Sequence, residues 1–128
     1  MSVRSSLMLS VAAATLVVST AFALHTHLVK AEPAADATVT EAPKQVRLWF
    51  NERPEVALSS ALLMSSDSAP VARIAMGKTD DTLSVAGAIP VALQPGGYIV
   101  VWKTGSADGH PVKGSYSFTY ATGAGARP

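Results

Sequence analysis

The chain of 128 residues contains no cysteine, is only 6% aromatic, and has no clear excess of charge of either sign. Without cysteine there can be no disulfide, thiolate metal site or cysteine nucleophile. Any metal ligand must therefore come from histidine, carboxylate, methionine or the backbone. Arg4 is the only charged residue among the first 23, so nine Lys and Arg remain beyond them, equal to the nine Asp and Glu. Nucleic acid is not an expected partner, because phosphate binding needs a basic excess.

The first 23 residues are typical of a secretory signal peptide. Arg4 supplies a positive start, residues 7–18 are almost entirely apolar, and Ala21-Phe22-Ala23 is a small-x-small cleavage site. A membrane anchor needs about 20 apolar residues, which is longer than this core. We therefore expect export to the periplasm and a protein that is not membrane-embedded after cleavage. Residues 24–121 are expected to form one domain, followed by a disordered tail at 122–128.

Short strands separated by turn residues account for the rest of the chain. Alternation predicts strands at 46–50 and 115–120, the latter with Tyr116, Phe118 and Tyr120 on one face. Weaker strands are expected at 37–40, 71–76, 83–85 and 89–93, and either one strand or a bent pair within 56–64. The segment 98–103 is apolar enough for burial on both faces, between a turn at 95–97 and a polar loop at 104–113. About seven strands without a helix predict an all-β, Greek-key β-sandwich, Ig-like or cupredoxin-like, or a small barrel.

Three histidines are the residues most suggestive of function. His25 and His27 follow the expected cleavage point, and His110 ends an Asp108-Gly109-His110 motif in the polar loop. An N-terminal strand of a sandwich can lie beside the C-terminal strands, so these residues can meet at one end. Cu(II) prefers nitrogen and oxygen donors, and Gly109 allows a sharp turn that aims both neighbours at one point. The alternative is two solvated histidines and an ordinary Asp-Gly hairpin turn.

Further motifs run in order along almost the whole chain. The N-terminal ones are His25-Thr26-His27-Leu28, Pro33 to Ala37, Ala42-Pro43 and Phe50-Asn51-Glu52. The C-terminal ones are Leu93 to Tyr98, Val101-Trp102, Ser106 to His110 and Lys113-Gly114. Together they resemble the CopC copper-resistance family, including its short stand-alone members.

The resemblance implies a small Greek-key β-sandwich with a Cu(II) site. The family builds that site from an N-terminal histidine with its amine and from the Asp-Gly-His motif, here His25, Asp108 and His110. Glu52 lies where some members place a glutamate near the copper, although a solvated residue at a strand end is an equally good interpretation. The implied role is copper capture, buffering or delivery in copper homeostasis and resistance. The implied partners are the copper ion and an inner-membrane transporter of the CopD type, and no catalytic residue is expected.

Two departures from the family pattern affect the metal. Leu24 stands between the predicted cleavage site and His25, so the chelating group at the N-terminus is open. Three N-terminal donor sets are compatible with the sequence. The first is the Leu24 amine with the His25 amide and imidazole. The second is a His25 amine with its own imidazole, and the third is a His25 amine with two backbone amides and the His27 imidazole. We expect His25 to be first in the bound form. Some members carry a methionine-rich loop for Cu(I), whereas here only Met64 and Met76 lie beyond the signal peptide, so no strong Cu(I) site is expected.

Two other functions remain open from the sequence. One is an oxidative copper enzyme of the N-terminal-histidine type, as in the polysaccharide monooxygenases. Those enzymes usually need a longer chain with a flat aromatic face, and this chain has few aromatic residues. The other is a metal-free Ig-like interaction module.

Overall fold

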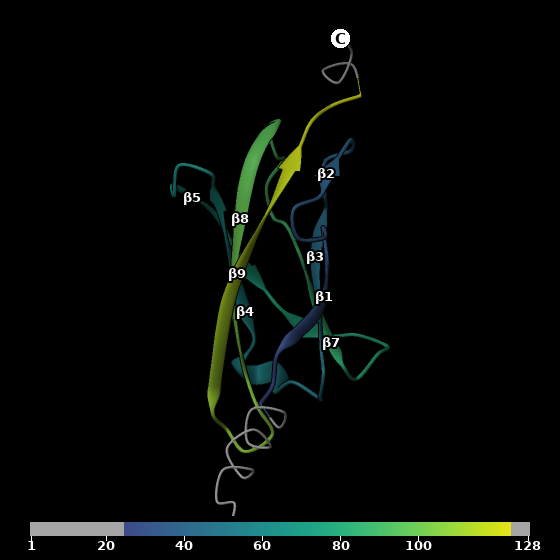
Figure 1. Ribbon diagram of the computed structural model, residues 1–128, viewed down its shortest axis with the longest axis vertical. Helices are drawn as coiled ribbons and strands as arrows, with labels where there is room; N and C mark the ends of the chain where they lie inside the picture. Colours follow the sequence, from purple (N-terminus) through teal and green to yellow (C-terminus); the bar gives the residue numbers. More distant parts are fainter. Residues whose placement is uncertain (1–24, 124–128) are drawn as a thin grey trace, which may run out of the picture.

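The computed structural model describes residues 25–123, which form two facing sheets (Figure 1). The predicted signal peptide at 1–23 and most of the predicted tail, 124–128, lie outside this range and stay predictions. The strands are β1 (Leu28–Glu32), β2 (Thr38–Val39), β3 (Gln45–Phe50), β4 (Ser60–Ser65), β5 (Pro70–Ala75), β6 (Gly77–Lys78), β7 (Ser84–Ala88), β8 (Gly96–Gly105) and β9 (Pro111–Tyr120), and a short 3-10 helix, η1, spans Val56–Leu58. None of the helical structure between residues 25 and 123 is long and apolar enough to cross a membrane.

One sheet has the strand order β1-β3-β7-β6 and the other the order β2-β9-β8-β4-β5. Neighbouring strands are antiparallel except β2 and β9, which are parallel. The predicted all-β sandwich is confirmed. The start of β1 and the β8–β9 loop lie at the same end of the sandwich, the lower end in Figure 1.

The core forms where the inward faces of the two sheets meet. On β3 the alternation follows the prediction, because Val46, Leu48 and Phe50 are almost completely buried. The Phe50 ring packs edge-on against Trp102 of β8, with 5.3 Å between the ring centroids. Burial of such large apolar side chains is the main term that holds the two sheets together.

The prediction that strand 98–103 is buried on both faces is wrong. Tyr98, Val100 and Trp102 are buried, whereas Val101 is 37% exposed and Lys103 is exposed. The strand lies in the five-stranded sheet, whose outer face is open over Val101. The alternation is hidden in the sequence because β-branched residues suit either face of a strand.

The predicted strand at 89–93 is also wrong. One strand, β7, runs through Gly87 to Ala88, and residues 89–93 form a connection. A Cβ on Gly87 would lie 2.2 Å from the Ala75 carbonyl oxygen, so this glycine allows close backbone approach and does not break the strand. The connection is apolar because Ile89 and Leu93 reach into the core, and Pro90 cannot donate a backbone hydrogen bond to a sheet.

The segment 56–64 is resolved as η1 followed by the single strand β4. Strand β8 already begins at Gly96, inside the predicted turn, and β8 and β9 extend into the predicted 104–113 loop. Their pairing reaches Gly105 opposite Pro111, so only residues 106–110 connect them. Tyr116 and Tyr120 pack against the core beside Phe118, as expected from the sequence.

Candidate functional site

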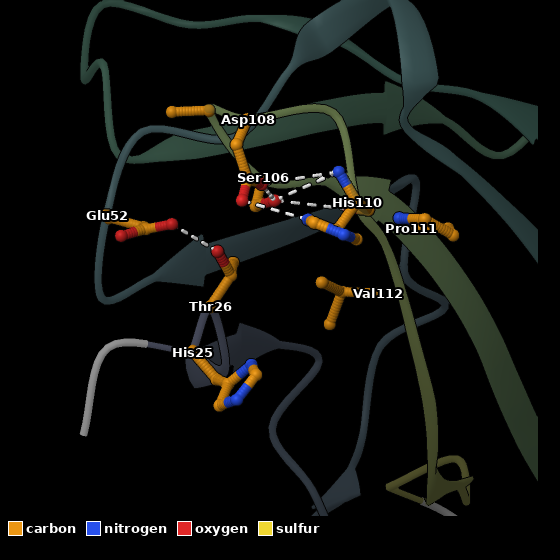
Figure 2. A pocket seen from close by; sticks show the side chains of 9 residues that line it. His25, Thr26, Glu52, Ser106, Asp108, His110, Pro111 and Val112 are labelled. Carbon is orange, nitrogen blue, oxygen red and sulfur yellow. Dashed lines mark hydrogen bonds and ion pairs between the residues drawn. The ribbon is translucent and has the colours of Figure 1, made fainter. Parts of the chain in front are cut away.

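A cavity of about 620 Å³ lies between the start of the described chain and the β8–β9 loop. It is lined by His25, Thr26, Glu52, Ser106, Ala107, Asp108, His110, Pro111 and Val112. Figure 2 shows the His25 ring on one side of this space and the Asp108 and His110 side chains on another. Residues that are far apart in the sequence therefore share one cavity, because β1 begins at the same end of the sandwich as the β8–β9 loop.

The loop side of the cavity is held by hydrogen bonds within residues 106–110. The Ser106 amide donates to the His110 carbonyl oxygen at 2.9 Å, and the Gly109 amide donates to the Ser106 carbonyl oxygen at 2.9 Å. Gly109 has φ +87°, a conformation that residues with a Cβ rarely adopt, and this allows the tight reversal. The reversal places Asp108 and His110 on the same side of the loop, where their side chains meet.

The Asp108 carboxylate accepts hydrogen bonds from two residues. The Ser106 hydroxyl donates to Oδ1, and His110 Nδ1 lies 2.8 Å from Oδ2. The hydrogen bond from Ser106, followed by those from His110, lowers the pKa of Asp108 to about 2, so this exposed carboxylate is ionised at neutral pH. An ionised carboxylate is only an acceptor, so the proton lies on His110 Nδ1 and Nε2 keeps a free lone pair when the ring is neutral.

The N-terminal side of the cavity is attached to the end of β3 through Asn51 and Glu52. The Asn51 side chain accepts a hydrogen bond from the His27 amide at 2.6 Å and donates one to the His25 carbonyl oxygen at 3.1 Å. The Asn51 backbone amide donates to the His27 carbonyl oxygen at 3.1 Å. Thr26, which is buried, donates its hydroxyl to the Glu52 carboxylate. These contacts fix the path of the backbone on both sides of Thr26.

The structure brings four of the five predicted site residues to the cavity. His25, Glu52, Asp108 and His110 line it, whereas His27 does not; its ring Nδ1 lies 3.2 Å from the His25 carbonyl oxygen. Glu52 is half-buried and bonded to Thr26, which corrects the interpretation of a solvated residue at a strand end. Within residues 25–123, no three His, Asp or Glu side chains are gathered closely enough to form a ready metal site.

Asn51 and Ser106 hold the site, although the sequence alone does not predict this role for either residue. Ser106 could have been found, because a serine two residues before an aspartate often forms a local side-chain hydrogen bond. Asn51 gives no comparable local signal, since its partners His25 and His27 lie across the β1–β3 contact. Only the pairing of these two strands brings the amide and the N-terminal segment together.

The fold and the cavity define a small β-sandwich protein with imidazole and carboxylate groups at one end. The chain belongs to the CopC domain family, whose domain matches residues 28–121. It is 33% identical over 96 residues to Protein YobA of Escherichia coli strain K12, covering 74% of this chain and 77% of YobA. It is 36% identical over 113 residues to Copper resistance protein C of Xanthomonas campestris pv. juglandis, covering 84% of this chain and 87% of that protein.

Two solved structures share the fold. CopC from Methylosinus trichosporium OB3b superimposes with a TM-score of 0.70 at 34% identity, covering 77% of this chain and 96% of that one. PcoC, a methionine-rich copper resistance protein from Escherichia coli, gives a TM-score of 0.63 at 32% identity, covering 75% and 98%. In this chain Met76 is buried in the core, and Met64 is a half-buried residue of β4.

Proposed function

We propose that this protein binds Cu(II) in the periplasm and sequesters, buffers or delivers the ion in copper homeostasis and resistance. The observation that carries the proposal is the shared cavity, which His25 lines from one side and Asp108 and His110 line from another although they come from opposite ends of the chain. Membership of the CopC family and relatives named as copper resistance proteins support copper as the cargo.

The donor set of the proposed site fits Cu(II). His110 offers Nε2, because Asp108 engages its other ring nitrogen. Asp108 retains an acceptor position on Oδ2, since each carboxylate oxygen has two lone pairs. His25 supplies a second imidazole from the opposite side of the cavity. Nitrogen and oxygen donors suit Cu(II), and the Irving–Williams order favours Cu(II) over Zn(II) at the same ligands. Glu52 is proposed as an acidic neighbour of the site.

We further propose that His25 is the first residue of the copper-bound form, so that its amine joins its imidazole as a chelate. Glu52 and Asn51 hold Thr26 and the adjoining backbone, which keeps His25 at the cavity. Mass spectrometry of the exported protein tests this directly. A mature chain that begins at His25 is expected, and a mature chain that retains Leu24 would contradict it.

The predicted signal peptide supports the periplasm as the place of action. An inner-membrane transporter of the CopD type is the proposed recipient or source of the ion. Asp108 and His110 are exposed, so a partner can reach them without unfolding the sandwich. Capture and transfer need no catalytic residue.

A competition titration with a Cu(II) chelator tests the proposed ligands. His110→Ala and His25→Ala are each expected to weaken Cu(II) binding by at least about 100-fold, since loss of an outer-shell partner alone costs roughly 10–100-fold. His27→Ala is the matched control, because His27 does not line the cavity, and it is expected to bind like the unchanged protein. The opposite pattern, with His27→Ala impaired and His110→Ala unaffected, would identify a purely N-terminal chelate and overturn the proposal.

A further inference from the structure

Ser106 lies at the point where β8 enters the loop, and it is only 9% exposed although its neighbours in the loop are open to solvent. Its hydroxyl oxygen is a local centre of polar contacts. It donates to Asp108 Oδ1 and accepts a hydrogen bond from the His110 backbone amide at 3.2 Å. The one serine side chain therefore touches both residues of the proposed ligand pair.

The contacts continue from Ser106 through Asp108 to the His110 ring. Asp108 Oδ1 is held by the serine hydroxyl and also accepts the His110 backbone amide at 3.3 Å. Oδ2 is then directed at His110 Nδ1, at 2.8 Å. A carboxylate fixed in this way keeps the proton on Nδ1 and leaves Nε2 as the nitrogen available to a metal.

We propose that Ser106 is a positioning residue that orders the Asp108–His110 pair and selects the Nδ1–H form of His110 before any metal arrives. Ser106 itself is not a ligand in this proposal. The consequence for copper binding rests on the function proposed above, whereas the ordering is a property of the metal-free protein. Preordering of this kind reduces the cost of arranging ligands when the ion binds.

The hydroxyl can be removed without removing the turn. The backbone bonds from Ser106 to His110 and from Gly109 to Ser106 do not involve the side chain, and neither does the positive φ of Gly109. Ser106→Ala should therefore keep the hairpin and lose only the hydroxyl's contacts with Asp108 and with the His110 backbone. Ser115→Ala is the matched control, since Ser115 is an exposed serine of β9 in the same hairpin.

The test begins with the metal-free protein, at a pH where imidazole is neutral. Nitrogen NMR of the His110 ring is expected to show mainly the Nδ1–H tautomer in the unchanged protein and in Ser115→Ala. Ser106→Ala is expected to show a mixture of tautomers and faster hydrogen exchange of the His110 amide. Asp108→Asn, a change on the exposed side of the loop, should give the same mixture of His110 tautomers although Ser106 is intact. A fixed Nδ1–H tautomer in Ser106→Ala would overturn the proposal, whatever Asp108→Asn shows.

Cu(II) competition on the same samples separates this inference from the proposed function. Ser106→Ala is expected to bind Cu(II) about tenfold more weakly than Ser115→Ala, the lower end of the cost of losing an outer-shell partner. If the unchanged protein binds Cu(II) and Ser106→Ala binds equally well, the positioning role in binding is wrong and the copper function stands. If no form binds Cu(II) but the tautomer shift is seen, the copper function is wrong and the ordering by Ser106 stands.

Discussion

Tyr116 and Tyr98 lie in the same β8–β9 hairpin, but their hydroxyl groups differ in hydrogen bonding. The Tyr116 hydroxyl is buried and, among the described side chains, is the buried polar atom without a hydrogen-bond partner. The Tyr98 hydroxyl, by contrast, donates to the Gln94 carbonyl oxygen. A buried polar group without a partner costs about 1–3 kcal/mol, so Tyr116 is a local weakness of the fold.

Replacing each tyrosine by phenylalanine should therefore affect the free energy of unfolding differently. Tyr116→Phe is expected to leave the free energy of unfolding unchanged or raise it by up to about 1 kcal/mol, because it removes the unpaired hydroxyl. Tyr98→Phe is the control and is expected to lower it by about 1 kcal/mol, because a satisfied hydrogen bond is lost. Urea unfolding of both variants measures the difference. A clear loss of stability in Tyr116→Phe would show that its hydroxyl has a partner.

Burial of the Tyr116 hydroxyl should also make the stability of the protein depend on alkaline pH. Burial raises the pKa of the Tyr116 hydroxyl above its ordinary value near 10. In the unfolded chain this phenol ionises at a lower pH than in the folded protein. Its ionisation therefore leaves the free energy of unfolding unchanged below about pH 10 and lowers it as the pH rises further. Tyr116→Phe should therefore lose less stability than the unchanged protein between about pH 10 and 11. Equal losses in urea unfolding at the two pH values would contradict this.

At the residue scale, the candidate site was only partly predictable. Asp108, Gly109 and His110 form a contiguous motif whose chemistry can be recognised directly. The role of Asn51 depends on a contact between β3 and the segment before β1, which no local pattern encodes. The alternative ligand His27 does not line the cavity, and Asn51 and Glu52 hold the backbone on both sides of Thr26.

Among the structural elements, the β8–β9 hairpin contributes side chains to both the core and the candidate site. Its inward residues fill the space between the sheets, and its loop carries Asp108 and His110. Trp102 packs on Gly114 of the opposite strand, where a Cβ would lie 2.6 Å from the indole ring. The sequence predicted the two strands but not their length. The sequence pattern places Lys113 in a loop, whereas it is an exposed residue of β9 that pairs with Lys103 of β8 in a continuous ladder.

The one-sided burial of β8 can be tested with the same substitution at two neighbouring valines. Val100 is completely buried and Val101 is 37% exposed. Val100→Thr is expected to lower the free energy of unfolding by about 1–3 kcal/mol, because it places a hydroxyl in the core. Val101→Thr should stay within about 0.5 kcal/mol of the unchanged protein, as is usual for a surface change. Similar large losses at both positions would restore the prediction of a strand buried on both faces.

At the scale of the whole molecule, the proposed copper site would join the two ends of the chain. The all-β sandwich itself could be predicted, because strand alternation and turn residues are local signals. The closure of the cavity could not, since it depends on the N-terminal segment and the β8–β9 loop lying at the same end of the sandwich. An ion bound by His25 and His110 would link the N-terminal segment to the last hairpin and so act on the stability of the whole sandwich.

Cu(II) should therefore raise the melting temperature. An ion that binds only the folded state adds about 2.7 kcal/mol when its free concentration is 100 times the dissociation constant. For a domain of this size the increase corresponds to roughly 10 °C or more. Calorimetry at fixed free Cu(II) measures the shift, with His110→Ala as the control. An equal shift in His110→Ala would mean that the ion does not bridge the two ends.

The central claim, one Cu(II) held by histidines from both ends of the chain, is tested most directly by pulsed electron paramagnetic resonance. The sample is the copper-loaded mature protein with its N-terminus verified by mass. This technique counts coordinated imidazoles. Two coordinated imidazoles are expected in the unchanged protein and in His27→Ala, and one is expected in His25→Ala and in His110→Ala. A single imidazole that persists when His110 is replaced would contradict it.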